Sequence, residues 1–185
     1  MRSFIAIELP ESVRTALSVL QQDLKTCGAD VRWVKPEGIH LTLKFLGEVK
    51  DKDVDRIVEI LEGTCKEYST FHLEINRIGT FPGKRSPRVL WVGISGDETL
   101  AALKRKIDDR MSSLGFEKEE RPFSPHLTLG RFKSSAGKEA MMQRVDSLKD
   151  SSVGKIEVTS ISLMRSDLGP AGATYTKIGE FLLNK

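Results

Sequence analysis

The chain has 185 residues, of which 39% are hydrophobic and 30% charged, a balance typical of a soluble globular protein rather than a disordered or membrane one. No apolar run approaches the roughly 20 residues that span a bilayer, and the first eight residues predict a strand rather than a signal peptide. We expect a cytoplasmic protein, and its net charge of +3 permits a polyanionic partner without requiring one.

Strands and helices alternate along the chain without a low-complexity linker. Apolar residues at helical spacing predict helices from Pro10 onward and over 51–67, 97–114 and 137–148. Strands are predicted at 2–8, 31–34, 40–46, 71–78, 88–94, 126–132, 154–166 and 174–182, with a turn-rich connection at 166–172. Hairpin-like and helical connections together indicate an α+β fold with largely antiparallel sheets. No GxGxxG or P-loop pattern supports nucleotide binding by a glycine-rich loop.

The most informative feature is a repeated tetrapeptide. His40 and His126 each begin an identical His-Leu-Thr-Leu segment, and each is preceded four residues earlier by a proline. The two copies lie 126 − 40 = 86 residues apart, close to half the chain, and they hold two of its three histidines. We therefore expect a single domain over residues 1–185, made of two pseudo-symmetric lobes that each carry one copy.

Strand geometry indicates what each copy offers chemically. Side chains alternate between the faces of a strand, so His40 and Thr42 share one face, as do His126 and Thr128, while the leucines pack on the other. If the two faces meet across a cleft, two imidazoles with pKa values near 6.5 can accept and donate a proton. The two threonine hydroxyls can hold an oxyanion between them. This pattern predicts a paired acid–base site.

Neighbouring residues extend the prediction. Lys44 continues the His40–Thr42 face and is a candidate cleft residue, whereas Phe45 falls on the leucine face and is expected in the core. Arg131 is a candidate phosphate contact, although strand parity places it off the His126–Thr128 face, so a bend or bulge at Gly130 is needed to turn it inward. With that bend we expect Phe132 to reach the cleft, where it can stack on a base.

Other candidate sites have weaker support. Two histidines are too few for zinc, and no carboxylate stands at a ligand-like spacing from them, so we expect neither a metal nor a cofactor. Cys27 and Cys65 are interpreted as packing residues, and His72 lacks a threonine partner and is assigned no role. The basic loop at 81–88 is an alternative contact for RNA phosphates or simply a solvated surface loop.

Paired His-x-Thr-x motifs half a chain apart resemble the signature of the 2H phosphoesterase superfamily. The flanking residues, including Lys44 to Val49 after the first motif and Gly130-Arg131 after the second, resemble its RNA 2′,3′-cyclic phosphodiesterase (LigT/ThpR) branch. That resemblance implies a bilobal fold with two antiparallel sheets facing a central cleft and helices outside. It also implies metal-free hydrolysis of RNA 2′,3′-cyclic phosphate ends to 2′-phosphates, and 2′–5′ joining of tRNA halves as the reverse reaction.

The near symmetry of the two motifs leaves the roles of the histidines open. By similarity, His126 is expected to take the proton from water and His40 to protonate the departing ribose oxygen. Thr42, Thr128 and Arg131 are then expected to bind the phosphate. Two other hypotheses stay open: a cyclic phosphodiesterase for a small nucleotide such as ADP-ribose cyclic phosphate, and a non-catalytic RNA-binding protein. The even spread of charge suggests a monomer.

Overall fold

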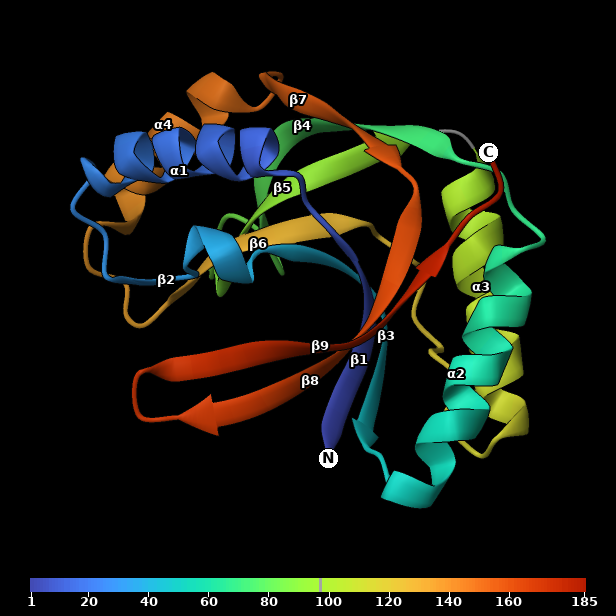
Figure 1. Ribbon diagram of the computed structural model, residues 1–185. Coiled ribbons are helices and arrows are strands. Elements are labelled where there is room, and N and C mark those ends of the chain that lie inside the picture. The colour runs from blue at the N-terminus through green and yellow to red at the C-terminus, as the bar shows by residue number, and fades with distance from the viewer. Residues whose placement is uncertain (97) are drawn as a thin grey trace.

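Two antiparallel sheets surrounded by helices form an α+β fold (Figure 1). The structure is a computed structural model that describes residues 1–96 and 98–185. The helices are α1 (Glu11–Lys25), the short 3-10 helix η1 (Pro36–Gly38), α2 (Asp51–Cys65), α3 (Glu98–Ser113) and α4 (Lys138–Leu148). The predicted α+β class and the antiparallel sheets are confirmed. Among the described residues, no helix has the length and apolar character that crossing a membrane requires.

Both sheets draw strands from both halves of the chain. Sheet A has the order β3 (His40–Glu48), β1 (Arg2–Glu8), β8 (Ser160–Gly169), β9 (Gly172–Leu182). Sheet B has the order β2 (Val31–Trp33), β6 (His126–Phe132), β5 (Val89–Gly96), β4 (Phe71–Phe81), β7 (Ser152–Val158). The first His-Leu-Thr-Leu strand therefore belongs to sheet A and the second to sheet B.

The element order repeats along the chain. If the additional elements β2, η1, β7 and β9 are set aside, the order β1, α1, β3, α2, β4 is followed by β5, α3, β6, α4, β8. In each sheet the motif strand pairs with the strand that opens its half, β3 with β1 and β6 with β5. From this repetition we propose that the chain is one domain of two related lobes. The strand β4 joins the sheet of β5 and β6, and β8 joins the sheet of β1 and β3, so each half adds a strand to the sheet of the other half.

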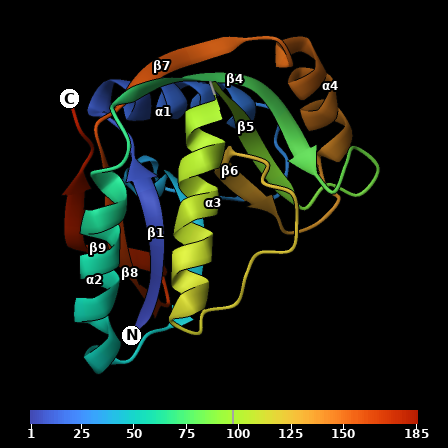
Figure 2. The ribbon, with the colours of Figure 1, turned by 90° about the vertical axis from the view of Figure 1, so that its right-hand side faces the viewer.

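The helices cover the outer faces of the sheets. The helices α2 and α3 pack together beside sheet A, and α1 and α4 lie against β7 and β4 of sheet B (Figures 1 and 2). Their apolar residues recur at helical spacing, as Val13, Leu17 and Leu24 do on α1, and all three are buried. One continuous core forms between the helices and the sheets.

Several predicted boundaries differ from the structure, most by one to three residues. The strand predicted at 154–166 is two strands, β7 and β8, which separate at Thr159 and enter different sheets. The turn predicted at 166–172 is shorter, because β8 and β9 stay paired out to Gly169 and Gly172. The resulting long hairpin runs beneath β2 and η1 in Figure 1. The helix predicted at 97–114 is observed from Glu98, and residue 97 lies outside the described residues.

Candidate active site

The two motif strands present their residues as the alternation predicts. His40, Thr42, His126 and Thr128 are each partly accessible. The leucines that alternate with them are at most 3% exposed, and these are Leu41, Leu43, Leu127 and Leu129. Burying a leucine stabilises the fold by about 2 kcal/mol, so these anchors fix the face that carries each histidine and threonine. We call that face the motif face of its strand.

Each imidazole is oriented by the backbone two residues before it. The Nδ1 atom of His126 lies 2.7 Å from the carbonyl oxygen of Ser124, and His40 has a hydrogen bond to the backbone of Gly38. A carbonyl can only accept, so Nδ1 of His126 carries a proton and donates it. In the neutral ring this leaves Nε2 without a proton, which makes that nitrogen available as a proton acceptor.

Aromatic rings enclose His40. Phe4 of β1 stacks on the imidazole with centroids 4.6 Å apart, and Tyr175 of β9 meets it edge-on at 5.0 Å. Burial lowers the pKa of His40 from 6.5, and the positive charge of Arg14 lowers it further. The Gly38 hydrogen bond and the carboxylate of Glu8 act in the opposite direction without offsetting the burial. His40 is therefore held mainly in its neutral form at pH 7.

A pH-dependent stability follows from this burial. In the unfolded chain His40 titrates near 6.5, whereas the folded protein resists protonation to lower pH. The unfolded state thus binds more protons as pH falls below 6.5, and the free energy of unfolding should decrease through that window. We expect His40→Gln to reduce this decrease in urea unfolding between pH 7.5 and 5, while His72→Gln, at an exposed position, should not. Equal pH dependence of unfolding in the wild type and in His40→Gln would contradict a lowered pKa for His40 in the folded protein.

His126 has a different aromatic neighbourhood. Phe81, at the end of β4, meets its ring edge-on with centroids 5.0 Å apart. Trp91 of β5 lies opposite Thr128 in the sheet and packs beside Phe81 at 5.1 Å. Its indole ring lies directly over Gly79, where a Cβ atom would approach it to 2.4 Å. Glycine is therefore required beneath the tryptophan, and the ring stays flat on the motif face of sheet B.

A bulge in β3 overturns two predictions. Ala6 of β1 pairs with Thr42, but the next residue, Ile5, pairs with Lys44, so β3 contains one extra residue after Thr42. The extra residue reverses the alternation. Lys44 turns to the core side and is 5% exposed, whereas Phe45 turns to the motif face and is 71% exposed. The expectations that Lys44 lines the site and that Phe45 is a core residue are both wrong.

Lys44 instead belongs to a buried ionic cluster. Its ammonium group binds the carboxylate of Asp108 on α3 and lies 2.6 Å from the backbone carbonyl of Glu117. Lys104 is 3.7 Å from the same carboxylate, and the backbone N–H of Glu119 donates to it. Burial alone would raise the pKa of Asp108, but the hydrogen bond and positive charges of the lysines lower it overall. The cluster joins β3 to the segment that leads into His126.

A matching bulge in β6 turns Arg131 inward. Trp91 pairs with Thr128 but Leu90 pairs with Gly130, so Leu129 is the extra residue. Arg131 then pairs with Val89, two residues from Trp91 on β5, and shares the face of Thr128. A side chain at Gly130 has no room, since its Cβ would lie 2.5 Å from Val31 and 3.1 Å from a backbone oxygen. The bend that Arg131 needs is present.

The same bulge has the opposite consequence for Phe132. Alternation resumes after Gly130, so Phe132 points to the other face of the sheet from Arg131. It pairs with Val31 and packs against the main hydrophobic core. The expectation that the bend would carry Phe132 toward the site is wrong, because one extra residue can bring only one of two successive side chains to a given face.

Sequence reasoning missed a charged group beside His40. Glu8 lies opposite His40 in the sheet, and its Oε2 accepts hydrogen bonds from the Ser162 hydroxyl at 2.8 Å and the Lys177 ammonium at 2.7 Å. Its position was visible in principle, because Glu8 ends the alternating run Phe4, Ala6, Glu8 on one face of β1. Nothing in the sequence indicated that β8 and β9 would supply the partners.

The remaining candidates take ordinary structural positions. Cys65 is fully buried, and burial raises the pKa of its thiol to about 12, so it stays protonated. His72 is exposed on β4, opposite Glu157. In the basic loop, Lys84 pairs with Asp146, while Arg85 and Arg88 are exposed. Within residues 1–96 and 98–185, no three His, Cys, Asp or Glu side chains cluster as a metal site requires.

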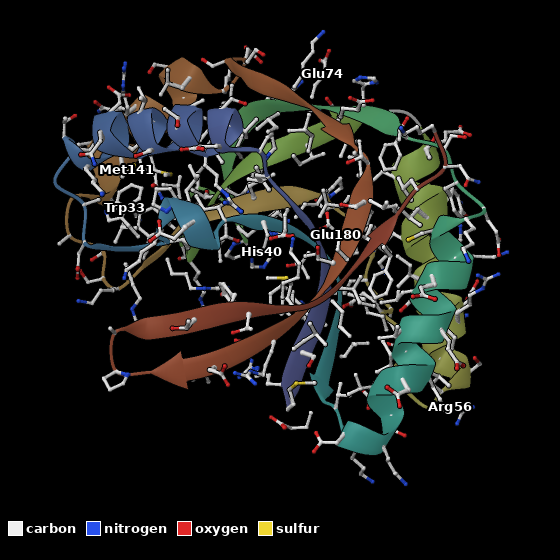
Figure 3. The ribbon with its side chains drawn as sticks, viewed as in Figure 1. Trp33, His40, Arg56, Glu74, Met141 and Glu180 are labelled. Atoms are coloured by element: carbon white, nitrogen blue, oxygen red, sulfur yellow. The ribbon has the colours of Figure 1, made fainter. Side chains whose placement is uncertain are left out.

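The two motif strands approach each other although they belong to different sheets. Residues of β3 and β6 come within 8 Å of one another at their Cα atoms. In Figure 3 the His40 side chain lies between sheet B above it and the β8–β9 hairpin below it. The fold thus brings the strands of both His-Leu-Thr-Leu segments together, with aromatic rings beside each histidine.

Known proteins share this architecture. The family model described as "LigT like Phosphoesterase" matches twice, over residues 7–91 and 92–175. The RNA 2′,3′-cyclic phosphodiesterase of Methanothermobacter thermautotrophicus is 37% identical over 183 residues, 99% of each chain, and that of Methanocaldococcus jannaschii is 36% identical over 98% of this chain and 100% of its own.

Solved structures agree with the family match. The protein TT0787 of Thermus thermophilus superposes with a TM-score of 0.85 at 28% identity, covering 99% of this chain and 98% of its own. E. coli LigT complexed with 3′-AMP gives 0.81 at 26% identity, covering 100% and 98%. The family model matches each half of the chain over its own His-Leu-Thr-Leu motif, and the relatives match over nearly the whole chain, which shows that the chain belongs to the LigT-like phosphoesterase family.

Proposed function

We propose that this protein hydrolyses RNA 2′,3′-cyclic phosphate ends to 2′-phosphomonoesters by acid–base catalysis with two histidines. The observation that carries the proposal is the matched pair of imidazoles, each held by a backbone group two residues earlier and each beside a threonine on its motif face. The relatives in M. thermautotrophicus and M. jannaschii that bear the name RNA 2′,3′-cyclic phosphodiesterase support the substrate class.

In the proposed reaction, the two motif faces line one site. Nε2 of His126 takes a proton from water as the water oxygen attacks phosphorus. The bond between phosphorus and the ribose 3′ oxygen breaks, and His40 gives its proton to that oxygen, which leaves the phosphate on the 2′ oxygen. Each imidazole ends in the protonation state in which the other began, and proton exchange with solvent restores both.

Hydrogen bonds to the phosphate would stabilise the transition state. The hydroxyls of Thr42 and Thr128 lie on the motif faces beside the imidazoles and are proposed to donate to the non-bridging oxygens as charge develops there. Arg131 shares the face of Thr128 and is proposed to bind the same phosphate, since a guanidinium can donate two parallel hydrogen bonds to phosphate oxygens.

The roles of the two histidines can be separated by changing the leaving atom. His40 must gain a proton to act as the acid, and its lowered pKa means that the anionic phosphate has to favour this protonation when it binds. A substrate with sulfur in place of the bridging 3′ oxygen releases a thiolate that needs no proton. We expect this substrate to restore activity to His40→Ala by at least about tenfold relative to the oxygen substrate, and not to His126→Ala. Rescue of His126→Ala instead would reverse the assignment.

Further parts of the proposal concern the cellular reaction. Joining of two RNA ends through a 2′–5′ linkage is the same displacement at phosphorus with a 5′ hydroxyl in place of water, so the 3′ oxygen leaves again and each histidine keeps its role; cleavage of that linkage back to the cyclic phosphate would exchange the roles. We propose tRNA-half-like RNA as the substrate of a monomeric cytoplasmic protein that works without metal or cofactor, since the two imidazoles supply both proton transfers.

A substrate panel tests the proposed function. We expect turnover of a short RNA that ends in a 2′,3′-cyclic phosphate, and none of the same RNA ending in a 3′-phosphate or of its internal linkages. The cyclic end is chemically distinct because its strained ester expels the 3′ oxygen without breaking the chain. Cleavage of internal linkages, or hydrolysis of the 3′-phosphate, would contradict the proposal.

A further inference from the structure

Arg32 faces Arg131 directly across the edge of sheet B. Within the antiparallel pair of β2 and β6, Arg32 pairs with Arg131. Val31 and Trp33, on either side of Arg32, pack against the main core, and the ammonium of Lys25 on α1 lies 5.7 Å from the centre of the Trp33 ring. Because successive side chains alternate, Arg32 must point to the opposite face, which is the motif face of Thr128 and Arg131.

Two arginines in this position repel each other. Directly opposite residues of an antiparallel pair lie about 5 Å apart, and like charges there destabilise the sheet. Both side chains are exposed, and among the described residues neither forms an ion pair with a carboxylate. The strand β2 is only three residues long and pairs with β6 alone, so the arginine pair stands at the edge of the sheet next to the candidate site.

We infer that Arg32 binds the backbone phosphodiester on the 5′ side of the terminal nucleotide. This inference rests on the proposed function, in which the cyclic phosphate occupies Thr128 and Arg131. The next negative charge along an RNA substrate is the phosphodiester that joins the terminal nucleotide to the rest of the chain. Arg32, one strand farther from His126 on the same face, is placed to receive it. An anionic chain lying along both guanidiniums would offset their repulsion.

This subsite distinguishes an RNA end from a free mononucleotide. A nucleoside 2′,3′-cyclic phosphate carries the reacting group but has no 5′ phosphodiester, so it would gain nothing from Arg32. A dinucleotide with the same cyclic end gains one charge-assisted contact. The arginine at this position would thus direct the protein toward RNA ends rather than small cyclic nucleotides.

Steady-state kinetics with two probes test the subsite. For the dinucleotide ApA ending in a 2′,3′-cyclic phosphate, we expect Arg32→Gln to raise KM about tenfold and to make KM less sensitive to salt. For adenosine 2′,3′-cyclic phosphate, KM and kcat should change less than about twofold, the expectation for a contact that this probe lacks. Arg56→Gln, on the exposed surface of α2, is the matched control and should change neither probe.

Failure of the Arg32 subsite and failure of the proposed function would give different results. No effect of Arg32→Gln on either probe, or an equal effect on both, would overturn the subsite. Calorimetry can test the subsite without turnover. It would compare the affinity of the wild type and of Arg32→Gln for the 2′-phosphate products of the dinucleotide and of the mononucleotide. If wild type cleaves neither probe, the proposed function fails, and a selective loss of dinucleotide-product affinity in Arg32→Gln would still support the phosphate contact.

Discussion

His126→Ala and His40→Ala are each expected to lower kcat for an RNA cyclic-phosphate end by about two to four orders of magnitude, the contribution of a positioned acid or base. KM should change little, because the threonines and Arg131 that would hold the phosphate remain. Single-turnover rates measure the effect directly. His72→Ala is the control, since this exposed histidine lies on β4 outside both motifs.

The double variant His40→Ala/His126→Ala tests whether the two histidines act together. If both imidazoles act in one transition state, removing the second after the first should cost little more, and the two losses should not multiply. Full multiplication of the two losses would indicate that the two histidines contribute to the rate independently of each other and do not act as a coupled pair. Activity within about tenfold of wild type in either single variant would contradict paired acid–base catalysis.

Removing one partner of the buried Lys44–Asp108 pair is expected to destabilise the protein by about 3–5 kcal/mol. The side chain of Lys44 is 3% exposed and that of Asp108 is 10% exposed, so Lys44→Met leaves a buried carboxylate with Lys104 as its remaining partner. Asp108→Asn should cost at least as much, because it leaves two buried ammonium groups without a counter-charge. Urea unfolding at pH 7 measures both.

An exposed ion pair of the same type gives the control. Lys84 and Asp146 have side chains 66% and 48% exposed, and Lys84→Met is expected to cost about 1 kcal/mol or less. The pKa of Asp108 in the folded protein is lowered below the ordinary value of 3.8. The ion pair therefore contributes its full stabilisation above pH 3.8 and loses it as the pH falls through the pKa of folded Asp108. A cost below about 1 kcal/mol for Lys44→Met would show that the pair does not hold β3 to α3.

The fold was largely predictable because its signals are local. Helical spacing in α1 and α2 and the alternation that opens β3 and β6 arise from neighbouring residues, and those elements begin where the sequence predicted them. The division of 154–166 into β7 and β8 was not predictable in this way. Thr159 carries no breaker signal, and the strands separate because each pairs with a different sheet, which is decided by distant residues.

The site shows the same division between local and distant causes. The shared faces of His40 with Thr42 and of His126 with Thr128 follow from strand parity and are observed. The positions of Lys44, Phe45 and Phe132 do not follow, because an extra residue directly after Thr42 in β3, and another directly after Thr128 in β6, reverses the parity of the residues that come next.

Only the second bulge left a trace in the sequence. Gly130 is a glycine inside a strand, which indicated a bend, and its missing side chain makes room for Val31. The first bulge has Lys44 at the corresponding position, and the partner that this lysine meets on the core side, Asp108, lies 64 residues away in the sequence.

The product of hydrolysis tests the central claim most directly. An RNA with a 2′,3′-cyclic phosphate end is incubated with the protein in excess EDTA, and the position of the phosphate in the product is read by phosphorus NMR. Paired histidine catalysis with departure of the 3′ oxygen predicts full activity and a 2′-phosphate alone. A 3′-phosphate product, or activity that EDTA abolishes, would contradict the account.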